Sequence, residues 1–315
     1  MVRVRNCWNR GKPAIFIWLI SALLFLIAFR LSLLSSSQHR HSIGSAQSIS
    51  SSEQRSRLYD KMARDLNEHG AVFLQGGETS QSLSLSELFS LKDGVITSVL
   101  KAANPPVRAN VLYLSTEFSL PISKAVRDVF LPYFDGAIWF QNSSLYHFSM
   151  FHASHHLVAV PATEDEIEDE ANSVKDVAEN VCPLNIILDK VILTSTGVLL
   201  GCWQVKSGTD PVTIRAKLRN ALPHAPEKQL YNPAMLHTSF ARLLGPPKIS
   251  SQEQDKETNL LQLFQSLVKR LNDQLRGFEA VVSELWYVEE YDVLALALDG
   301  RIKSRKFQLG CKRTF

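Results

Sequence analysis

Cysteine is scarce in this chain. The 315 residues include four cysteines, no Cys-x-x-Cys motif and no internal repeat that is visible by identity. A thiol redox motif of that spacing is therefore excluded. In an oxidising compartment, Cys182, Cys202 and Cys311 would leave at least one thiol without a partner in the same chain. Cys182 precedes one expected strand and Cys202 lies in the next, so we expect this pair if a disulfide forms; three buried thiols are the alternative.

An excess of one charge sign is also absent from most of the chain. Five of the 34 basic residues lie before residue 35, where no acidic residue occurs, and the rest of the chain carries slightly fewer basic residues than its 31 acidic ones. A surface that holds long nucleic acid needs clustered Lys and Arg. No long nucleic acid is therefore expected as a partner, whereas a small anionic substrate remains compatible with this composition.

One long apolar run lies near the N-terminus. Residues 13–34 are almost wholly apolar apart from Arg30, and they are long enough to cross a bilayer of about 30 Å as a helix. The basic residues of segment 1–12 favour a cytosolic tail, so the chain is expected to be a single-pass type II membrane protein of the endoplasmic reticulum or Golgi with a luminal C-terminal domain. A cleaved signal peptide is the alternative, but its apolar region is typically only about 7–15 residues long.

Three further segments follow the apolar run. Residues 35–56 are rich in Ser and have little to bury, which predicts a disordered stem. Residues 57–136 show mixed helix and strand patterns to which no chemistry can be assigned. They form either an N-terminal subdomain or an elaboration of the domain expected at residues 137–315.

The strongest chemical pattern is a pair of His-x-Ser triplets, His147-Phe148-Ser149 and His237-Thr238-Ser239, each in a short apolar run. Residues i and i+2 of a strand point to the same face, so each triplet places an imidazole and a hydroxyl side by side. Two such pairs across a cleft could hydrolyse a phosphodiester: one His takes a proton from water, the other protonates the leaving oxygen, and the hydroxyls bind phosphoryl oxygens. Arg242 lies at the end of the second run and is either a phosphate ligand or a surface cation.

The second run, Leu236-His237-Thr238-Ser239-Phe240-Ala241-Arg242, resembles the second signature of the 2H phosphoesterases, which typically reads Pro-His-x-Thr-Leu-Ala-Arg. Leu236 replaces the Pro, and Ser239 replaces the commoner Thr. The resemblance covers roughly residues 137–309. It implies an α+β fold with two lobes, each an antiparallel sheet with outer helices, that close on a cleft holding both motifs. This fold would follow one N-terminal transmembrane helix.

The elements between the motifs agree with that resemblance. Thr163 and Glu166 predict a capping box for a helix over 163–181, and Asp210-Pro211 predicts the start of another helix. Two strands are expected at 184–193 and 198–205. After the second motif, the patterns predict one further helix and three further strands, at 253–276, 280–288, 291–298 and 302–309.

Other features have weaker interpretations. His152-Ala153-Ser154 is an alternative first motif, and the neighbouring His155 and His156 lack spaced carboxylate or thiol partners. No metal and no cofactor are therefore expected. The sequon at Asn142 could carry a glycan if its turn is exposed in the lumen.

The sequence thus predicts a metal-independent phosphodiester hydrolase that acts on a cyclic nucleotide or on an RNA end with a 2′,3′-cyclic phosphate. RNA ends are scarce in the secretory lumen, so two alternatives remain. One is a non-catalytic, membrane-anchored binding module that retains the fold. The other is a Golgi-type glycan-modifying protein, although no Asp-x-Asp motif lies in a suitable loop.

Overall fold

The computed structural model describes residues 50–76, 83–92, 94–248 and 256–312. Its helices are α2 (Ser51–His69), η1 (Val72–Gln75), α3 (Leu85–Leu88), α4 (Thr116–Phe134), η2 (Ser143–Leu145), α5 (Glu164–Glu179), α6 (Pro211–Ala221), α7 (Lys256–Leu275) and α8 (Ala295–Leu298). Its strands are β1 (Phe89–Lys92), β2 (Val95–Ser98), β3 (Ala102–Tyr113), β4 (Ile138–Phe140), β5 (His147–Ser154), β6 (Leu184–Leu193), β7 (Val198–Ser207), β8 (His237–Leu243), β9 (Glu279–Val282), β10 (Glu284–Asp292) and β11 (Ile302–Gln308).

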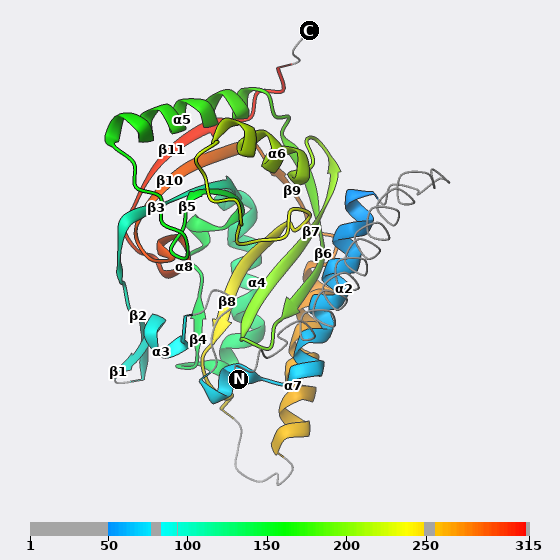
Figure 1. Cartoon of the computed structure of the whole chain (residues 1–315). Helices are drawn as coiled ribbons and strands as arrows, with labels where there is room; N and C mark the ends of the chain where they lie inside the picture. The colour runs from blue at the N-terminus through cyan, green and yellow to red at the C-terminus, as the bar shows by residue number, and fades with distance from the viewer. Residues whose placement is uncertain (1–49, 77–82, 93, 249–255, 313–315) are drawn as a thin grey trace, which may run out of the picture. The chain divides into compact units, whose positions relative to one another are not determined.

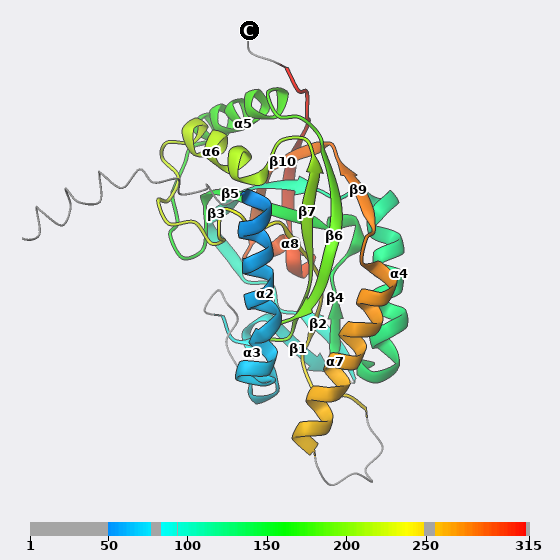
Figure 2. The same cartoon turned by 90° about the vertical axis from the view of Figure 1, so that its right-hand side faces the viewer.

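Two antiparallel sheets and the helices outside them form the folded unit (Figure 1). The first sheet has the order β11-β10-β3-β5, and the second has the order β4-β8-β7-β6-β9; β1 and β2 form a separate hairpin. Helices α5 and α6 pack on the first sheet, whereas α2 and α7 pack on the second (Figure 2). The predicted α+β class with antiparallel sheets and outer helices is confirmed. The two sequence motifs lie on β5 and β8, one in each sheet.

Alternating burial decides which face of each sheet meets the main core. On β7, Leu199 and Trp203 belong to the core that includes α4 and α7, whereas Leu200 and Cys202 pack against α2. The second sheet is therefore covered on both faces, by α2 on one side and by α4 and α7 on the other. This burial of both faces explains why β6 and β7 are almost continuously apolar.

Two of the helix starts that the sequence predicts are present, whereas the start expected at residue 253 lies outside the described residues. Thr163 and Glu166 form a reciprocal capping box at the start of α5. The carboxylate of Asp210 accepts from the backbone N–H of Val212 at the start of α6, and Pro211 occupies its first turn. Both signals act within one turn of chain, so they operate independently of the rest of the fold.

The N-terminal half differs from the expectation in two places. Residues 51–56 of the expected stem are helical, because Ser50 caps α2 and the guanidinium of Arg55 is buried in an ion pair with Asp210. Strand β3 lies between β5 and β10, so residues 57–136 elaborate the same fold and no domain boundary falls at 137. The expected anchor at 13–34 lies outside the described residues. None of the helices in the described ranges is long and apolar enough to cross a membrane.

The C-terminal strands also differ from the expectation. The strand predicted at 291–298 is wrong: β10 ends at Asp292, and the short helix α8 occupies the space before β11. Leu294 and Asp299, which flank α8, have φ values of 59° and 58°. The left-handed backbone at both ends turns the chain in and out of the helix, which lies in the connection between the paired strands β10 and β11.

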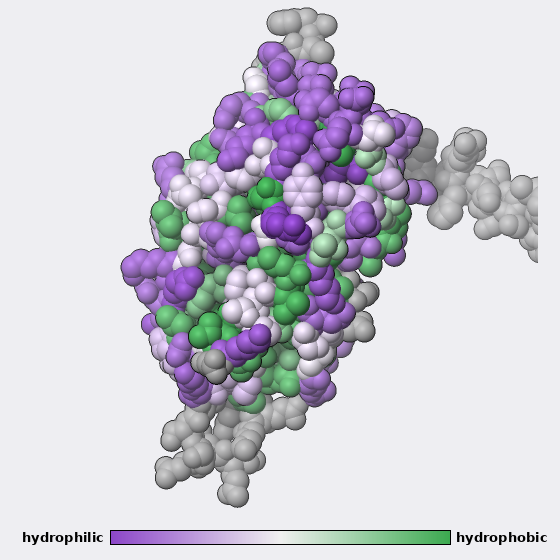
Figure 3. All heavy atoms as spheres, turned by 90° about the vertical axis from the view of Figure 1, so that its left-hand side faces the viewer, coloured by the Kyte–Doolittle hydropathy of each residue, from purple (hydrophilic) through white to green (hydrophobic). Residues whose placement is uncertain are grey.

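Hydrophobic residues also reach the surface of the folded unit. Figure 3 shows them on one face as patches between hydrophilic residues, which dominate the upper part of that view. Among the described residues, the large apolar side chains with the greatest exposure include Leu91 and Val95 of the β1–β2 hairpin. These two side chains thus leave apolar surface of the hairpin open to solvent.

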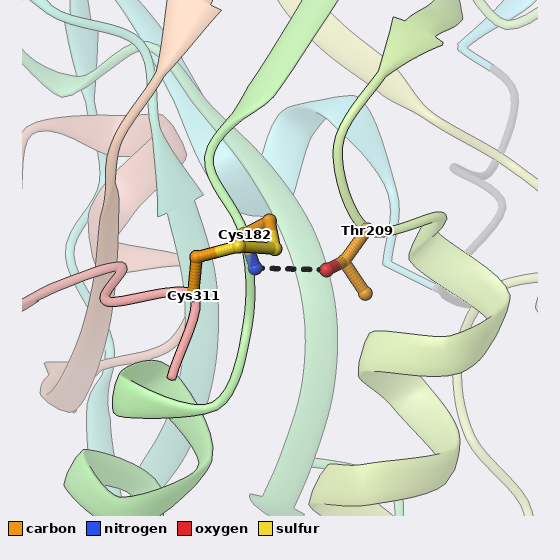
Figure 4. Close-up of a disulfide and its surroundings, with 3 residues drawn as sticks. All are labelled: Cys182, Thr209 and Cys311. Carbon is orange, nitrogen blue, oxygen red and sulfur yellow. Dashed lines mark hydrogen bonds between the residues drawn. A yellow bond between two sulfur atoms is a disulfide. The ribbon is translucent and has the colours of Figure 1, made fainter. Parts of the chain in front are cut away.

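The expected pairing of Cys182 with Cys202 is wrong. The structure has a disulfide between Cys182 and Cys311 (Figure 4). Cys202 is a buried free thiol. Strand β6 pairs Asn185 with Ser207 and Lys190 with Cys202, so Cys202 lies about eight residues along the ladder from Cys182. At about 3.3 Å per residue this separation is far beyond the reach of a disulfide.

Candidate active site

Both His-x-Ser triplets lie on strands with the same burial pattern. On β5, Phe148 points into the main core and packs edge-on against Trp203, so His147 and Ser149 point to the other face. On β8, Thr238 is buried in the same way between His237 and Ser239. In each triplet the middle side chain is therefore buried and anchors the strand. The side chains of its two neighbours point to the opposite face of the sheet.

That surface is one cavity of about 460 Å³ between the two sheets. His147, Ser149, His237, Ser239 and Arg242 all line it. The tertiary structure thus brings together every residue for which the sequence suggested a catalytic or phosphate-binding role. The hydroxyls of both serines have no hydrogen-bond partner among the residues that the structure describes, so they are available to a ligand.

His147 has a defined tautomer. Its Nδ1 lies 2.7 Å from the carbonyl oxygen of Leu145. A carbonyl can only accept, so Nδ1 carries the proton and Nε2 keeps its lone pair while the ring is neutral. Burial lowers the pKa of His147 below its usual value, and the hydrogen bond to Leu145 opposes this shift. The ring is therefore neutral near pH 7 and suited to accept a proton.

His237 has a different environment. Its ring lies 5.1 Å from the ring of Tyr231, centroid to centroid, and no hydrogen bond to it is found within the described part of the chain. Burial lowers the pKa of His237 to about 3, and the charges of Arg215 and His147 add to this effect. Both histidines line the same cavity.

Arg242 supplies an unpaired cation to the cavity. Its Nη1 is buried and has no hydrogen-bond partner among the described residues. Burial also lowers the pKa of the guanidinium to about 10, which leaves it charged at neutral pH. A buried donor without a partner costs free energy, and an anion in the cavity would remove that cost. Arg242 therefore lines the cavity with a buried guanidinium nitrogen, and its role as a phosphate ligand stays a prediction.

Arg215, a buried residue of α6, lies outside both motifs and was not predicted as part of the site. Its guanidinium donates to the carbonyl oxygens of Ser149 and Met150 on β5 and to those of Pro233 and Met235 ahead of β8. Arg215 therefore links the two motif strands, although it does not itself line the cavity. A signal was present in the sequence, because position 215 falls on the apolar stripe of α6, where a cation is unusual.

Residues 57–136 contribute to the site, although no chemistry was assigned to them. Leu58 and Met62 of α2 and Val111 of β3 line the cavity. Glu290 of β10 was also missed: burial raises the pKa of its carboxyl to about 7, and it accepts from the backbone N–H of Leu296 in α8. This carboxyl can therefore titrate within the cavity near neutral pH.

The alternative motif at His152 is only partly exposed to the cavity. His152 lines it, and burial followed by the charge of His155 lowers the pKa of His152 to about 3. The hydroxyl of Ser154 accepts from the backbone N–H of Val160 and does not line the cavity. The triplet at 152 thus lacks the free hydroxyl that the triplet at 147 has.

The remaining predictions concern the sequon at Asn142 and metal binding. Asn142 is exposed outside this cavity and caps η2, and its Nδ2 donates to Asp299 at 3.0 Å. The structure groups no three His, Cys, Asp or Glu side chains suitably for a metal ion in the ranges that it describes.

Neither a family model nor a curated protein matches this chain. Solved structures with similar coordinates include TT0787 of Thermus thermophilus, at 13% identity and a TM-score of 0.45 over 66% of this chain and all of that chain. E. coli LigT complexed with 3′-AMP is 12% identical, with a TM-score of 0.39 over 65% of this chain and 98% of LigT. Kluyveromyces marxianus Usb1 is 14% identical, with a TM-score of 0.35 over 64% of this chain and 98% of Usb1. At this level of similarity, function has to be inferred from the residues of the site itself.

Proposed function

We propose that this protein is a metal-independent phosphodiester hydrolase that opens a cyclic phosphodiester such as a 2′,3′-cyclic phosphate. The observation that carries the proposal is the single cavity that both His-x-Ser pairs share with the unpaired guanidinium of Arg242. A phosphodiester has one negative charge, which matches one free cation. The four motif side chains supply the proton acceptor, the proton donor and two hydroxyl donors that its hydrolysis needs.

In this proposal His147 is the general base. Its Nε2 accepts a proton from water as the water oxygen bonds to phosphorus, because Nδ1 is already committed to Leu145. The bond from phosphorus to the leaving oxygen then breaks, and His237 donates a proton to that oxygen. The product is a phosphomonoester with a free hydroxyl. Arg242, Ser149 and Ser239 bind the non-bridging oxygens as charge increases on them.

The test is hydrolysis of a 2′,3′-cyclic nucleotide by the purified protein. His147→Ala and His237→Ala should each lower kcat/KM by about 10²–10⁴-fold, the usual cost of losing a general acid or base. Ser149→Ala and Ser239→Ala should each cost less, since one hydrogen bond is lost. Chelator should leave the rate unchanged. Activity that survives His237→Ala would refute the mechanism, and a folded protein that turns over no phosphodiester would favour the binding module.

We also propose a luminal location for this domain, with residues 13–34 as an uncleaved anchor. The apolar length of that segment and the basic residues before it support this topology. In sealed microsomes the domain should resist protease until detergent is added. A glycan that is lost in Asn142→Gln would support the same topology, because Asn142 is exposed. Protease digestion of the domain in intact microsomes would overturn it.

A further inference from the structure

One side of the candidate active site is aliphatic. Leu58 and Met62 of α2, Val198 and Leu200 of β7, and Met235 ahead of β8 pack into one cluster, and all five line the cavity. We call these five residues the apolar wall. It is built from three separate parts of the chain, and its side chains face the same space as the two histidines.

The apolar wall lies directly beside the second motif. Strand β7 pairs with β8 so that Leu200 is opposite Ser239 and Val198 is opposite Arg242. Side chains on directly opposite residues of an antiparallel pair share a face, with Cβ atoms about 4.5–5.5 Å apart. A phosphoryl group bound by Ser239 and Arg242 would therefore hold its organic substituent against this wall.

The first motif has a similar neighbour. Strand β3 places Val111 opposite Ser149, and Val111 also lines the cavity. Val111 packs with Leu296 of α8, which lines the cavity from the same side. Aliphatic groups thus flank the motif hydroxyls on both sheets.

The charged residues of the cavity do not suit a polyanion. Apart from the histidines, the charged side chains of the described residues that line it are Asp65, Arg242 and Glu290, which is one cation against two carboxyl groups. Each phosphate of a bound RNA strand would normally meet a Lys or Arg. Besides the histidines, Tyr231 is the only aromatic residue among the described residues that line the cavity. Its ring lies against His237.

We infer that the substrate is a phosphodiester with an aliphatic chain, which lies along the apolar wall while Arg242 and the serines hold its single anionic phosphoryl group. This inference rests on the proposed hydrolase function and specifies its substrate class. Water opens the cyclic ester as described above, and the chain takes no part in the bond changes. Its burial against the wall contributes binding energy that an RNA end cannot obtain there.

The test is a series of 1-acylglycerol 2,3-cyclic phosphates with acyl chains of two to eight carbons, assayed below the concentration at which they form micelles. The reacting ring is the same in every member, so only the chain varies. We expect kcat/KM to rise about two- to fourfold per methylene until the cavity is full. The octanoyl ester should also exceed 2′,3′-cyclic CMP.

Two variants test whether the dependence on acyl-chain length arises at the apolar wall. Met62→Gln, a change of similar size on the half-buried wall, should reduce the octanoyl-to-acetyl ratio of kcat/KM at least tenfold. Leu131→Gln makes a comparable polar change at an exposed position of α4, which does not line the cavity, and should leave the ratio unchanged. A ratio near one in the wild-type protein, or a preference for cyclic CMP, would overturn this inference and leave the hydrolase intact. Failure to open any cyclic ester would instead overturn the proposed function, and the inference with it.

Discussion

The two motif strands share a sequence pattern but differ in their surroundings. β5 is the edge strand of its sheet, whereas β8 lies between β4 and β7. On β5, a backbone carbonyl fixes the tautomer of His147. On β8, the ring of His237 contacts Tyr231, and the unpaired Arg242 lies on the same strand. The repeated His-x-Ser pattern is therefore chemically asymmetric, and this asymmetry underlies the separate roles that we propose for the two histidines.

Arg215 connects the two strands despite these differences. It donates to backbone carbonyls on both sides of the cavity and makes no ion pair among the described residues. Burial lowers its pKa to about 10, so it remains charged at neutral pH. Its charge lowers the pKa of His237 directly, and no such effect is resolved on His147. The same residue therefore fixes both strands and contributes to their asymmetry.

The largest expected difference between the strands concerns the leaving group. A 4-nitrophenolate departs without a proton, so His237→Ala should lose less than about tenfold on a 4-nitrophenyl phosphodiester. His147→Ala should still lose about 10²–10⁴-fold on that ester, because water must still be deprotonated. Steady-state kinetics on the 4-nitrophenyl ester and on a cyclic nucleotide measure both effects. If His147→Ala were the variant rescued by the activated ester, the two roles would be exchanged.

The second-largest effect on activity is expected from a change at Arg242, a residue that has no counterpart on the first motif strand. Arg242→Met should lower kcat/KM by about 10–10³-fold, because one charged donor to the phosphoryl oxygens is lost. The same variant should raise Tm by a few degrees, since a buried unpaired charge is replaced by an apolar side chain of similar length. Kinetics and thermal unfolding of one preparation test both. A fall in Tm would show that Arg242 has a structural partner and would weaken its assignment to phosphate.

The smallest effect is expected in the pH dependence. Burial lowers the pKa of both His147 and His237 from about 6.5, so both rings are neutral in the free protein at pH 7. The proposed acid must be in its charged, protonated form, so kcat/KM should fall about tenfold per unit as pH rises above 6.5. The profile of kcat should lie at higher pH, because the bound anion favours the charged imidazole. A profile of kcat/KM that rises from pH 6.5 to 8 would contradict the environment described for these histidines.

Much of the local structure could be read from the sequence. Thr163 with Glu166 and Asp210 with Pro211 marked two helix starts correctly, and two apolar runs marked the strands that became β6 and β7. These signals succeed because they depend on residues within one turn or one strand. The prediction failed at 291–298, where the carboxyl of Glu290 accepts from the backbone of α8. The two residues of that contact are close together in the sequence, but the contact forms only inside the buried space that the first sheet provides.

The sequence by itself determined that each His and its Ser share a face, because side chains of a strand alternate with a period of two. It did not determine that the two faces would meet, since β5 and β8 belong to different sheets. Only the tertiary structure paired Cys182 with Cys311, left the guanidinium of Arg242 without a partner among the described residues, and placed α2 along the cavity. Each of these outcomes joins segments far apart in the chain. Such contacts depend on how whole elements pack, which no short sequence pattern encodes.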